Sequence, residues 1–129
     1  MGRAKTVKRA RILLADDDLQ VLAAVNKLLQ TEFEIVDMVS DGSALVTAAF
    51  KLQPDVIITD ISMPKLNGIE AIRQIRGFLP AIKCIFLTMH GANGYRKEAQ
   101  RVGSTGYVLK SSAREELNQV IRHAMEDSA

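Results

Sequence analysis

The segment Val56-Ile57-Ile58-Thr59-Asp60 decides the fold, because a short run of β-favouring residues leads directly into a carboxylate. A continuous run of this length is typical of a strand that is buried on both faces, as the strands of a parallel sheet are. Asp60 would then lie at the mouth of an apolar core, where a charged side chain usually serves chemistry. It is the first candidate site residue.

The rest of the chain alternates between short apolar runs and longer segments whose apolar residues recur at helical spacing. The other short runs are residues 12–15, 35–39, 84–88 and 106–109. The amphipathic segments are residues 21–29, 45–52, 69–75, 95–102 and 117–124. Strands that alternate with helices indicate a parallel sheet that is covered on both faces. We therefore expect one doubly wound α/β domain with five strands, each followed by a helix.

Length and composition fit a single soluble domain, with 129 residues of which 47% are hydrophobic and 25% are charged. No apolar stretch approaches the roughly 20 residues that a membrane-spanning helix needs. The first apolar run is also too short for a signal peptide. We expect a cytoplasmic protein with no membrane partner. Cys84 is the only cysteine, which excludes an internal disulfide, and its apolar neighbours favour a buried structural thiol.

Basic residues are concentrated at the start of the chain. Five of the 17 Lys and Arg residues lie within residues 1–11, which contain no acid, whereas the net charge of the whole chain is only +2. Such a tail can contact nucleic acid, but no aromatic side chains are interleaved with the basic ones. We expect residues 1–10 to form a flexible, solvated tail without a function and residues 11–129 to form the domain.

Charged side chains follow three of the expected strands. Asp16 and Asp17 follow the strand at 12–15, Asp60 follows the strand at 56–59, and Lys110 follows the strand at 106–109. The carboxyl ends of parallel strands lie along one edge of the sheet, where open α/β sheets bind their ligands. Three acids and one base are therefore expected to converge. Asp18 is expected to cap the first helix instead of joining them.

Three neighbouring carboxylates repel one another unless a cation neutralises them. Oxygen ligands without a histidine or cysteine favour Mg²⁺, Mn²⁺ or Ca²⁺ over zinc. A metal together with Lys110 would attract an anion, and the hydroxyl of Thr88 at the end of the fourth strand could donate to it. This set suits phosphoryl transfer onto an aspartate. Asp60 is the better nucleophile because it stands alone, whereas Asp16 and Asp17 are paired as a metal anchor would be.

Four sequence motifs occur in order at the ends of the expected strands, and together they are highly specific. They are ILLADDD (12–18), DISMPKLNG (60–68), FLT (86–88) and GYVLK (106–110). With these motifs the chain resembles the receiver domain of two-component response regulators from Arg11 to about Glu126. The resemblance implies a flavodoxin-like fold with strand order 2-1-3-4-5. It also implies a regulatory phosphoacceptor that catalyses only its own phosphorylation and dephosphorylation, not an enzyme with an external substrate.

The resemblance assigns roles to individual residues. Asp60 would accept a phosphoryl group from a sensor histidine kinase. Asp17, Asp60 and the main-chain carbonyl of Ser62 would ligate Mg²⁺ or Mn²⁺ directly, and Asp16 would act through a water. Lys110 would pair with the carboxylate and then with the phosphoryl group.

A switch is implied as well. Thr88 would move to bond a phosphoryl oxygen, and Tyr107 would move inward behind it. The face formed by the fourth helix, fifth strand and fifth helix would then dimerise or meet partners.

Two residues, Met89 and Ser111, depart from the pattern that is common in the family, and His90 lies beside the first of them. Met89 stands where a small residue is frequent, and its bulk could hinder access to the phosphoryl group. His90 could influence the attack of water, and with Met89 it could tune the lifetime of the phosphorylated state. Ser111 replaces the usual proline after Lys110, so a cis bond there would cost about 2.5–4 kcal/mol relative to trans. Both a cis bond and a different loop remain open from sequence.

The segments TMH (88–90) and KSS (110–112) resemble the subfamily that carries a LuxR-type helix-turn-helix. DNA would be reached only through such a C-terminal output domain, which this chain lacks, so an excised domain is expected. Two other functions were compared. A pseudo-receiver that only binds partners is disfavoured by the intact set of Asp17, Asp60, Thr88 and Lys110. A phosphohydrolase of the haloacid dehalogenase type is suggested by Asp16-x-Asp18, but the Thr-Gly pair that usually follows is absent.

Overall fold

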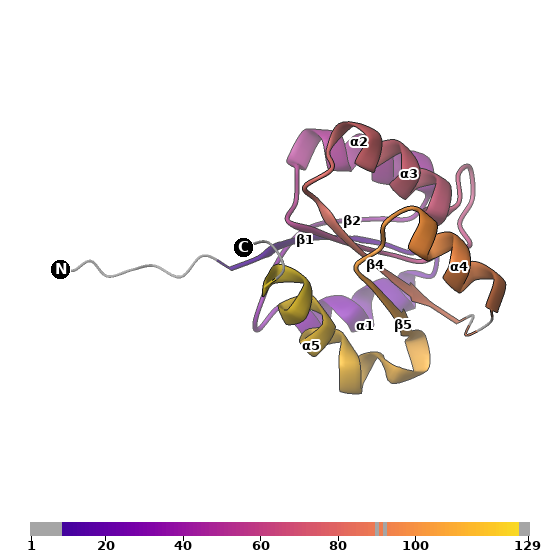
Figure 1. The fold of residues 1–129 in the computed structure, drawn as a ribbon. Coiled ribbons are helices and arrows are strands. Elements are labelled where there is room, and N and C mark those ends of the chain that lie inside the picture. The colour runs from indigo at the N-terminus through magenta and orange to yellow at the C-terminus, as the bar shows by residue number, and fades with distance from the viewer. Residues whose placement is uncertain (1–8, 90, 92, 127–129) are drawn as a thin grey trace.

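The computed structural model describes residues 9–89, 91 and 93–126. Within these residues, five parallel strands form one sheet in the order β2-β1-β3-β4-β5, which confirms the expected topology (Figure 1). The strands are β1 (Arg11–Ala15), β2 (Glu34–Val39), β3 (Val56–Thr59), β4 (Lys83–Thr88) and β5 (Gly106–Leu109). The helices are α1 (Leu19–Leu29), α2 (Gly42–Leu52), α3 (Gly68–Phe78), α4 (Asn93–Arg101) and α5 (Ala113–Glu126). A short 3₁₀ helix, η1 (Lys110–Ser112), joins β5 to α5.

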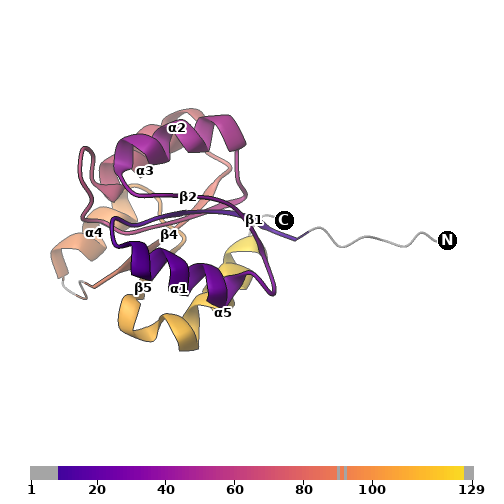
Figure 2. The same ribbon diagram turned by 180° about the vertical axis from the view of Figure 1, so that it is seen from behind.

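The helices lie on both faces of the sheet, so the domain has three layers. Figure 2 shows α1 and α5 against one face, with α2 and α3 against the other. Each face has its own apolar core: the core under α2 and α3 includes Leu45 and Ile72, and the core under α1 and α5 includes Leu29 and Leu117. Such two-sided coverage is what a parallel sheet requires.

Burial differs between the central and the edge strands. All four residues of β3 are buried, as the apolar run predicted. β2, by contrast, contains no fully buried residue. Its position at the edge of the sheet explains the difference, because only one neighbouring strand, β1, covers its side. Asp37 and Glu34 are exposed on this strand, and charges of this kind protect a sheet edge from pairing with other chains.

Two local expectations are met. The Asp18 carboxylate accepts hydrogen bonds from the backbone N–H groups of Gln20 and Val21, at 2.9 and 3.3 Å, and so caps α1. Cys84 is 1% exposed, and burial raises the pKa of its thiol to about 11 despite the opposing positive charge of Arg76. The thiol is therefore a packing group.

The peptide bond between Lys110 and Ser111 decides between the two loop conformations that the sequence left open. The described residues contain no cis peptide bond, so Lys110 and Ser111 are joined in trans and the loop differs from one with a cis bond. None of the described helices combines the length and the apolar character that crossing a bilayer would require. Of the expected basic tail, only Arg9 and Ala10 lie within the described residues; residues 1–8 lie outside them.

Candidate functional site

The carboxyl edge of the sheet brings the predicted site residues together. Asp16 and Asp17 follow β1, Asp60 follows β3, and Lys110 begins η1 directly after β5. Carboxylate oxygens of Asp16, Asp17 and Asp60 all lie within 4.8 Å of one another. The strand register explains this convergence, because Ala15 pairs with Thr59 and each acid follows its strand immediately.

The backbone fixes two of the three acids rigidly. The N–H of Asp60 donates to the carbonyl of Ala15 at 3.0 Å, and the N–H of Asp16 donates to the carbonyl of Val39 at 3.1 Å. Asp16 and Asp60 are only 3% and 7% exposed, whereas Asp17 is exposed. The site therefore has a buried floor of two carboxylates and one acid at its open side.

Lys110 connects the two buried acids. Its ammonium Nζ lies 2.8 Å from Asp16 Oδ2 and 3.0 Å from Asp60 Oδ2. The second oxygen of each carboxylate is occupied by a backbone donor: Asp60 Oδ1 accepts from the N–H of Ile61 at 2.7 Å, and Asp16 Oδ1 accepts from the N–H of Asp18 at 2.9 Å. Each buried carboxylate thus has a partner for both oxygens, as buried charges require.

Burial and pairing act on the titration of these groups in opposite directions. Burial raises the pKa of Asp16 and outweighs the hydrogen bonds from Lys110 and from the backbone of Asp18, which lower it. For Lys110, burial lowers the pKa, but the hydrogen bonds to Asp16 and Asp60 and their negative charges together raise it above its ordinary value. Lys110 is therefore protonated. Burial of the Asp16 carboxylate costs free energy when this carboxylate is charged.

The donor set fits a hard divalent cation. The three carboxylates carry three negative charges when they are ionised, and the ammonium of Lys110 offsets only one, so two negative charges are left over. The donors are oxygens, and among the described residues the groups that could hold a metal contain no histidine or cysteine. This composition favours Mg²⁺ or Mn²⁺ over zinc, in agreement with the expectation from sequence. Ser62 lies exposed in the loop two residues after Asp60.

Two glycines hold the loop after β3 against the rest of the site. A Cβ atom on Gly68 would lie 2.0 Å from the carbonyl oxygen of Asp60, and one on Gly42 would lie 1.9 Å from the carbonyl oxygen of Leu66. The N–H of Gly68 also donates to the carbonyl of Ile61 at 2.7 Å. The backbone that carries Asp60 can approach α3 this closely only because a side chain is absent. Neither close approach is evident from the local sequence, because each depends on how distant segments pack.

The two expected switch residues share one face of the sheet. Thr88 is fully buried at the end of β4, and Tyr107 is partly buried on β5. Tyr107 pairs in register with Phe86, and residues two apart on a strand point to the same side. Thr88 and Tyr107 therefore lie on the face that is covered by α2 and α3, to whose core Tyr107 contributes.

Of the two candidate tuning residues, only Met89 lies within the described residues. Met89 follows Thr88 directly and is 78% exposed, so its side chain lies largely in solvent. His90 lies outside the described residues.

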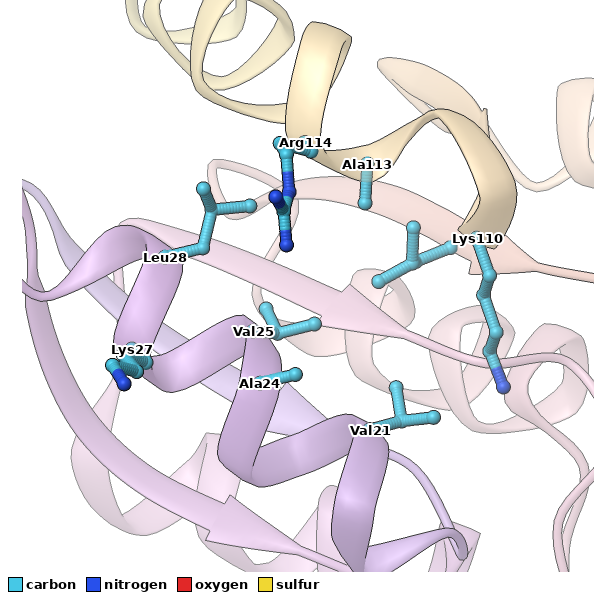
Figure 3. Close-up of a pocket in the computed structure, with 9 residues that line it drawn as sticks. Val21, Ala24, Val25, Lys27, Leu28, Lys110, Ala113 and Arg114 are labelled. Carbon is cyan, nitrogen blue, oxygen red and sulfur yellow. The ribbon is translucent and has the colours of Figure 1, made fainter.

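A groove with a volume of about 490 Å³ lies beside the site (Figure 3). One wall is α1, with Val21, Ala24 and Leu28, and the other is formed by Ala113 and Arg114 at the start of α5. Lys110 lines the same groove, which therefore adjoins the carboxylates that this lysine binds. Sequence reasoning did not find this groove, because it depends on how α1 and α5 lie relative to each other.

The strand order and the acidic cluster together indicate what kind of domain this is. A flavodoxin-like sheet of order 2-1-3-4-5, with an acidic cluster and a lysine at its carboxyl edge, is the arrangement of a signalling receiver. The model of the response regulator receiver domain family matches residues 12–122, and the chain belongs to this family.

Relatives in sequence are bacterial transcriptional regulators. The chain is 35% identical over 123 residues to the uncharacterized transcriptional regulatory protein YxjL of Bacillus subtilis, covering 94% of this chain and 56% of that protein. It is 38% identical over 116 residues to the transcriptional regulatory protein DesR of Bacillus subtilis, covering 88% and 57%. The chain thus spans about half the length of the curated relatives it matches.

Solved structures agree with this assignment. A two-component response regulator of the LuxR family from Aurantimonas superposes with a TM-score of 0.88 at 30% identity, covering 93% of this chain and 87% of the other. The isolated receiver domain of RcsB from Salmonella enterica, solved in the presence of the phosphomimetic BeF₃⁻, superposes with a TM-score of 0.84 at 28% identity, covering 92% and 90%. The resemblance to LuxR-type regulators that the sequence motifs indicated is confirmed.

Proposed function

We propose that Asp60 accepts a phosphoryl group from a sensor histidine kinase and that the phosphorylated domain controls the output of a transcriptional regulator. The single observation that carries this proposal is the contact of Lys110 Nζ with Asp60 Oδ2 at 3.0 Å, next to a second buried carboxylate. A carboxylate that contacts an ammonium group at the edge of the apolar core is suited to receive a phosphoryl group, because the ammonium can offset the added negative charge. Asp60 is the acceptor because its backbone is fixed by β3, α3 and the neighbouring β1.

The proposed reaction transfers a phosphoryl group between two side chains. A carboxylate oxygen of Asp60 attacks phosphorus, the P–O bond forms, and the P–N bond of the donor phosphohistidine breaks. The bonding pair stays on the imidazole nitrogen, which takes a proton from solvent. Lys110 can stabilise the negative charge of the transferred group, because the ammonium that now binds Asp60 Oδ2 can move to a phosphoryl oxygen.

A divalent cation would be held by Asp17, Asp60 and the main-chain carbonyl of Ser62, with Asp16 acting through a water. Bound there, Mg²⁺ or Mn²⁺ would neutralise phosphoryl oxygens in the transition state. The proximity of the three carboxylates supports this assignment. In this proposal the exposed Asp17 lies at the open side of the site, from which the phosphoryl donor approaches.

Thr88 and Tyr107 form the proposed switch. The Thr88 hydroxyl would bond a phosphoryl oxygen, and Tyr107 would move inward on the same face of the sheet. Their shared face supports this sequence of events. The surface of α4, β5 and α5 would then dimerise or meet partners. Met89 and His90 would tune the lifetime of the phosphorylated state.

The groove between α1 and α5 is the proposed contact with the kinase. Its lining is apolar along α1 and carries the cationic Lys27 and Arg114, without an acid among its lining residues. This chemistry suits a helix with an apolar face flanked by acidic side chains. Because Lys110 lines both the groove and the site, a helix lying there would bring its phosphohistidine close to Asp60.

The domain division and the wider setting belong to the same proposal. Residues 11–129 would form the receiver and residues 1–10 a basic tail. DNA would be contacted only by a C-terminal output domain, as the names of the relatives as transcriptional regulators suggest. The domain would work in the cytoplasm and turn over no external substrate.

Acid-quenched intact mass spectrometry tests the central step. The protein is incubated with Mg²⁺ and acetyl phosphate, and one added phosphoryl group is expected. Asp60→Asn is expected to abolish it, whereas the matched variant Asp55→Asn, at the opposite edge of the sheet, is expected to keep it. An adduct that persists in Asp60→Asn would contradict the assignment. An unphosphorylated protein with acetyl phosphate, phosphoramidate and a phosphorylated kinase alike would favour a pseudo-receiver.

A further inference from the structure

Arg96 of α4 lies over the aromatic ring of Tyr107 of β5, with its guanidinium carbon 4.6 Å from the ring centroid. A cation at this distance over a ring face is attracted by the electrons of the ring. Arg96 is exposed and Tyr107 is partly buried, so the guanidinium covers the solvent side of the ring. The contact joins a helix to a strand that follows it in sequence, and no motif in the sequence indicated it.

The location of this contact gives it a consequence for the switch. Tyr107 pairs in register with Phe86 on β4, and Thr88 points to the same face two residues further along. Arg96 therefore touches Tyr107 from the solvent side, whereas Thr88 lies toward the phosphoacceptor. The inward movement proposed above would therefore carry the ring away from Arg96.

We propose that Arg96 is a positioning residue that holds Tyr107 in its present, partly exposed conformation and so opposes the activated state of the domain. This inference rests on the proposed function, in which Tyr107 moves inward behind Thr88. A guanidinium cannot follow the ring into the apolar core without losing its hydration. The inward movement must therefore break the contact, and a contact present in only one of two states biases the equilibrium toward that state.

The expected size of the bias follows from the exposure of the arginine. Cation–π contacts at exposed sites shift an equilibrium by about two- to fivefold. Arg96→Ala is therefore expected to raise the population of the activated conformation by about two- to fivefold. A ligand that binds only that conformation should bind more tightly by the same factor.

The first measurement tests the contact without any phosphoryl chemistry. The chain has two tyrosines and no tryptophan, so Tyr95→Phe leaves Tyr107 as the only phenol. Burial raises the pKa of Tyr107, and the positive charge of Arg96 opposes that rise. In the Tyr95→Phe background, Arg96→Ala is expected to raise the pKa of Tyr107 further, followed by phenolate absorbance. An unchanged titration would overturn the contact and the proposal with it.

The second measurement tests the bias with beryllofluoride, a phosphoryl mimic, in the presence of Mg²⁺. Calorimetry is expected to show about two- to fivefold tighter binding for Arg96→Ala and a partial return toward the original affinity for Arg96→Lys. Lys97→Ala is the matched control, because it removes an exposed cation from the next position of the same helix. A lost cation by itself weakens the binding of an anion, so Lys97→Ala should show no gain.

A double-variant cycle locates the effect on the tyrosine. In a Tyr107→Leu background, Arg96→Ala is expected to give no gain in the affinity for beryllofluoride, because the ring that the arginine held is gone. An equal gain with and without the ring would overturn the proposal, as would equal affinities for Arg96→Ala and Lys97→Ala. If the unsubstituted protein does not bind beryllofluoride at all, the proposed function fails and takes the bias with it, while the phenol titration still reports the contact.

Discussion

Lys110 Nζ lies closer to Asp16 Oδ2, at 2.8 Å, than to Asp60 Oδ2, at 3.0 Å. One ammonium is thus shared between two buried carboxylates, and the lysine stabilises the pair as much as it serves the candidate acceptor. Predictions for stability follow from this sharing, and they can be measured without a phosphodonor.

Lys110→Met should destabilise the metal-free protein. The substitution leaves Asp16 and Asp60 buried without their cation, and we expect a loss of about 1–3 kcal/mol in the free energy of unfolding at pH 7. Urea denaturation measures it. Mg²⁺ should recover part of the loss, because a bound cation would replace the missing charge. Lys65→Met, which removes a side chain that is 70% exposed, should change stability far less; equal losses in the two variants would contradict the prediction.

Asp16→Asn should stabilise the metal-free protein at neutral pH. The pKa of Asp16 is raised by burial, so its protonated form is favoured in the folded state. The stability that this group contributes is complete below the unfolded pKa, near 3.8, and is lost as the pH rises through the higher folded pKa. The free energy of unfolding of Asp16→Asn should therefore exceed that of the unsubstituted protein at pH 7, and the gap should close toward pH 3.5. A gap that widens in acid would show that the sign is wrong.

Gly68→Ala should destabilise the domain, whereas Gly77→Ala in the same helix should not. The new Cβ at residue 68 would meet the Asp60 carbonyl, and the required backbone shift should cost about 1–3 kcal/mol. At residue 77 nothing lies within 4 Å of the new Cβ, so alanine should add about 0.5–1 kcal/mol through its better helix propensity. Thermal or urea unfolding compares the two. Gly68→Ala should also slow modification by acetyl phosphate, because its backbone clash displaces Asp60.

Ala24→Asp should slow phosphorylation by a histidine kinase and leave phosphorylation by acetyl phosphate unchanged. Ala24 lines the groove between α1 and α5, and a carboxylate there would repel the acidic helix that we propose as its occupant. A loss of about tenfold corresponds to roughly 1.4 kcal/mol in the transfer step. The matched variant is Ala23→Asp, at the preceding exposed position, which does not line the groove. The rates for the two variants are measured by transfer of a radiolabelled phosphoryl group from a kinase that phosphorylates the unsubstituted chain. Equal rates in all three proteins would exclude the groove as the contact with the kinase.

The strands and the strand-end acids could be predicted because both depend on short-range pattern. The run at 56–59 coincides with β3, and the run at 106–109 coincides with β5. The convergence of Asp16, Asp60 and Lys110 then followed from the rule that parallel strands share one carboxyl edge. The family motifs added the strand order, which alternation alone leaves open.

The missed features all require tertiary packing. Gly42 matters because Leu66 of a distant loop lies against it, and no local pattern indicates that approach. Arg96 looks like one more charge on a polar helix until β5 places Tyr107 beneath it. The incomplete burial of β2 likewise follows from its place at the sheet edge and not from its composition.

Lys110 follows the last strand, whereas the two acids that share it follow the first and third strands, and this order affects when the domain acquires its chemistry. During synthesis, Asp16 and Asp60 leave the ribosome well before Lys110, which follows β5. A nascent chain that ends before β5 carries the candidate acceptor but not its counter-cation, and the sheet cannot be completed by local contacts alone. Under the proposed function, competence for phosphorylation would arise only when the whole domain has folded, so truncated or misfolded chains would send no signal.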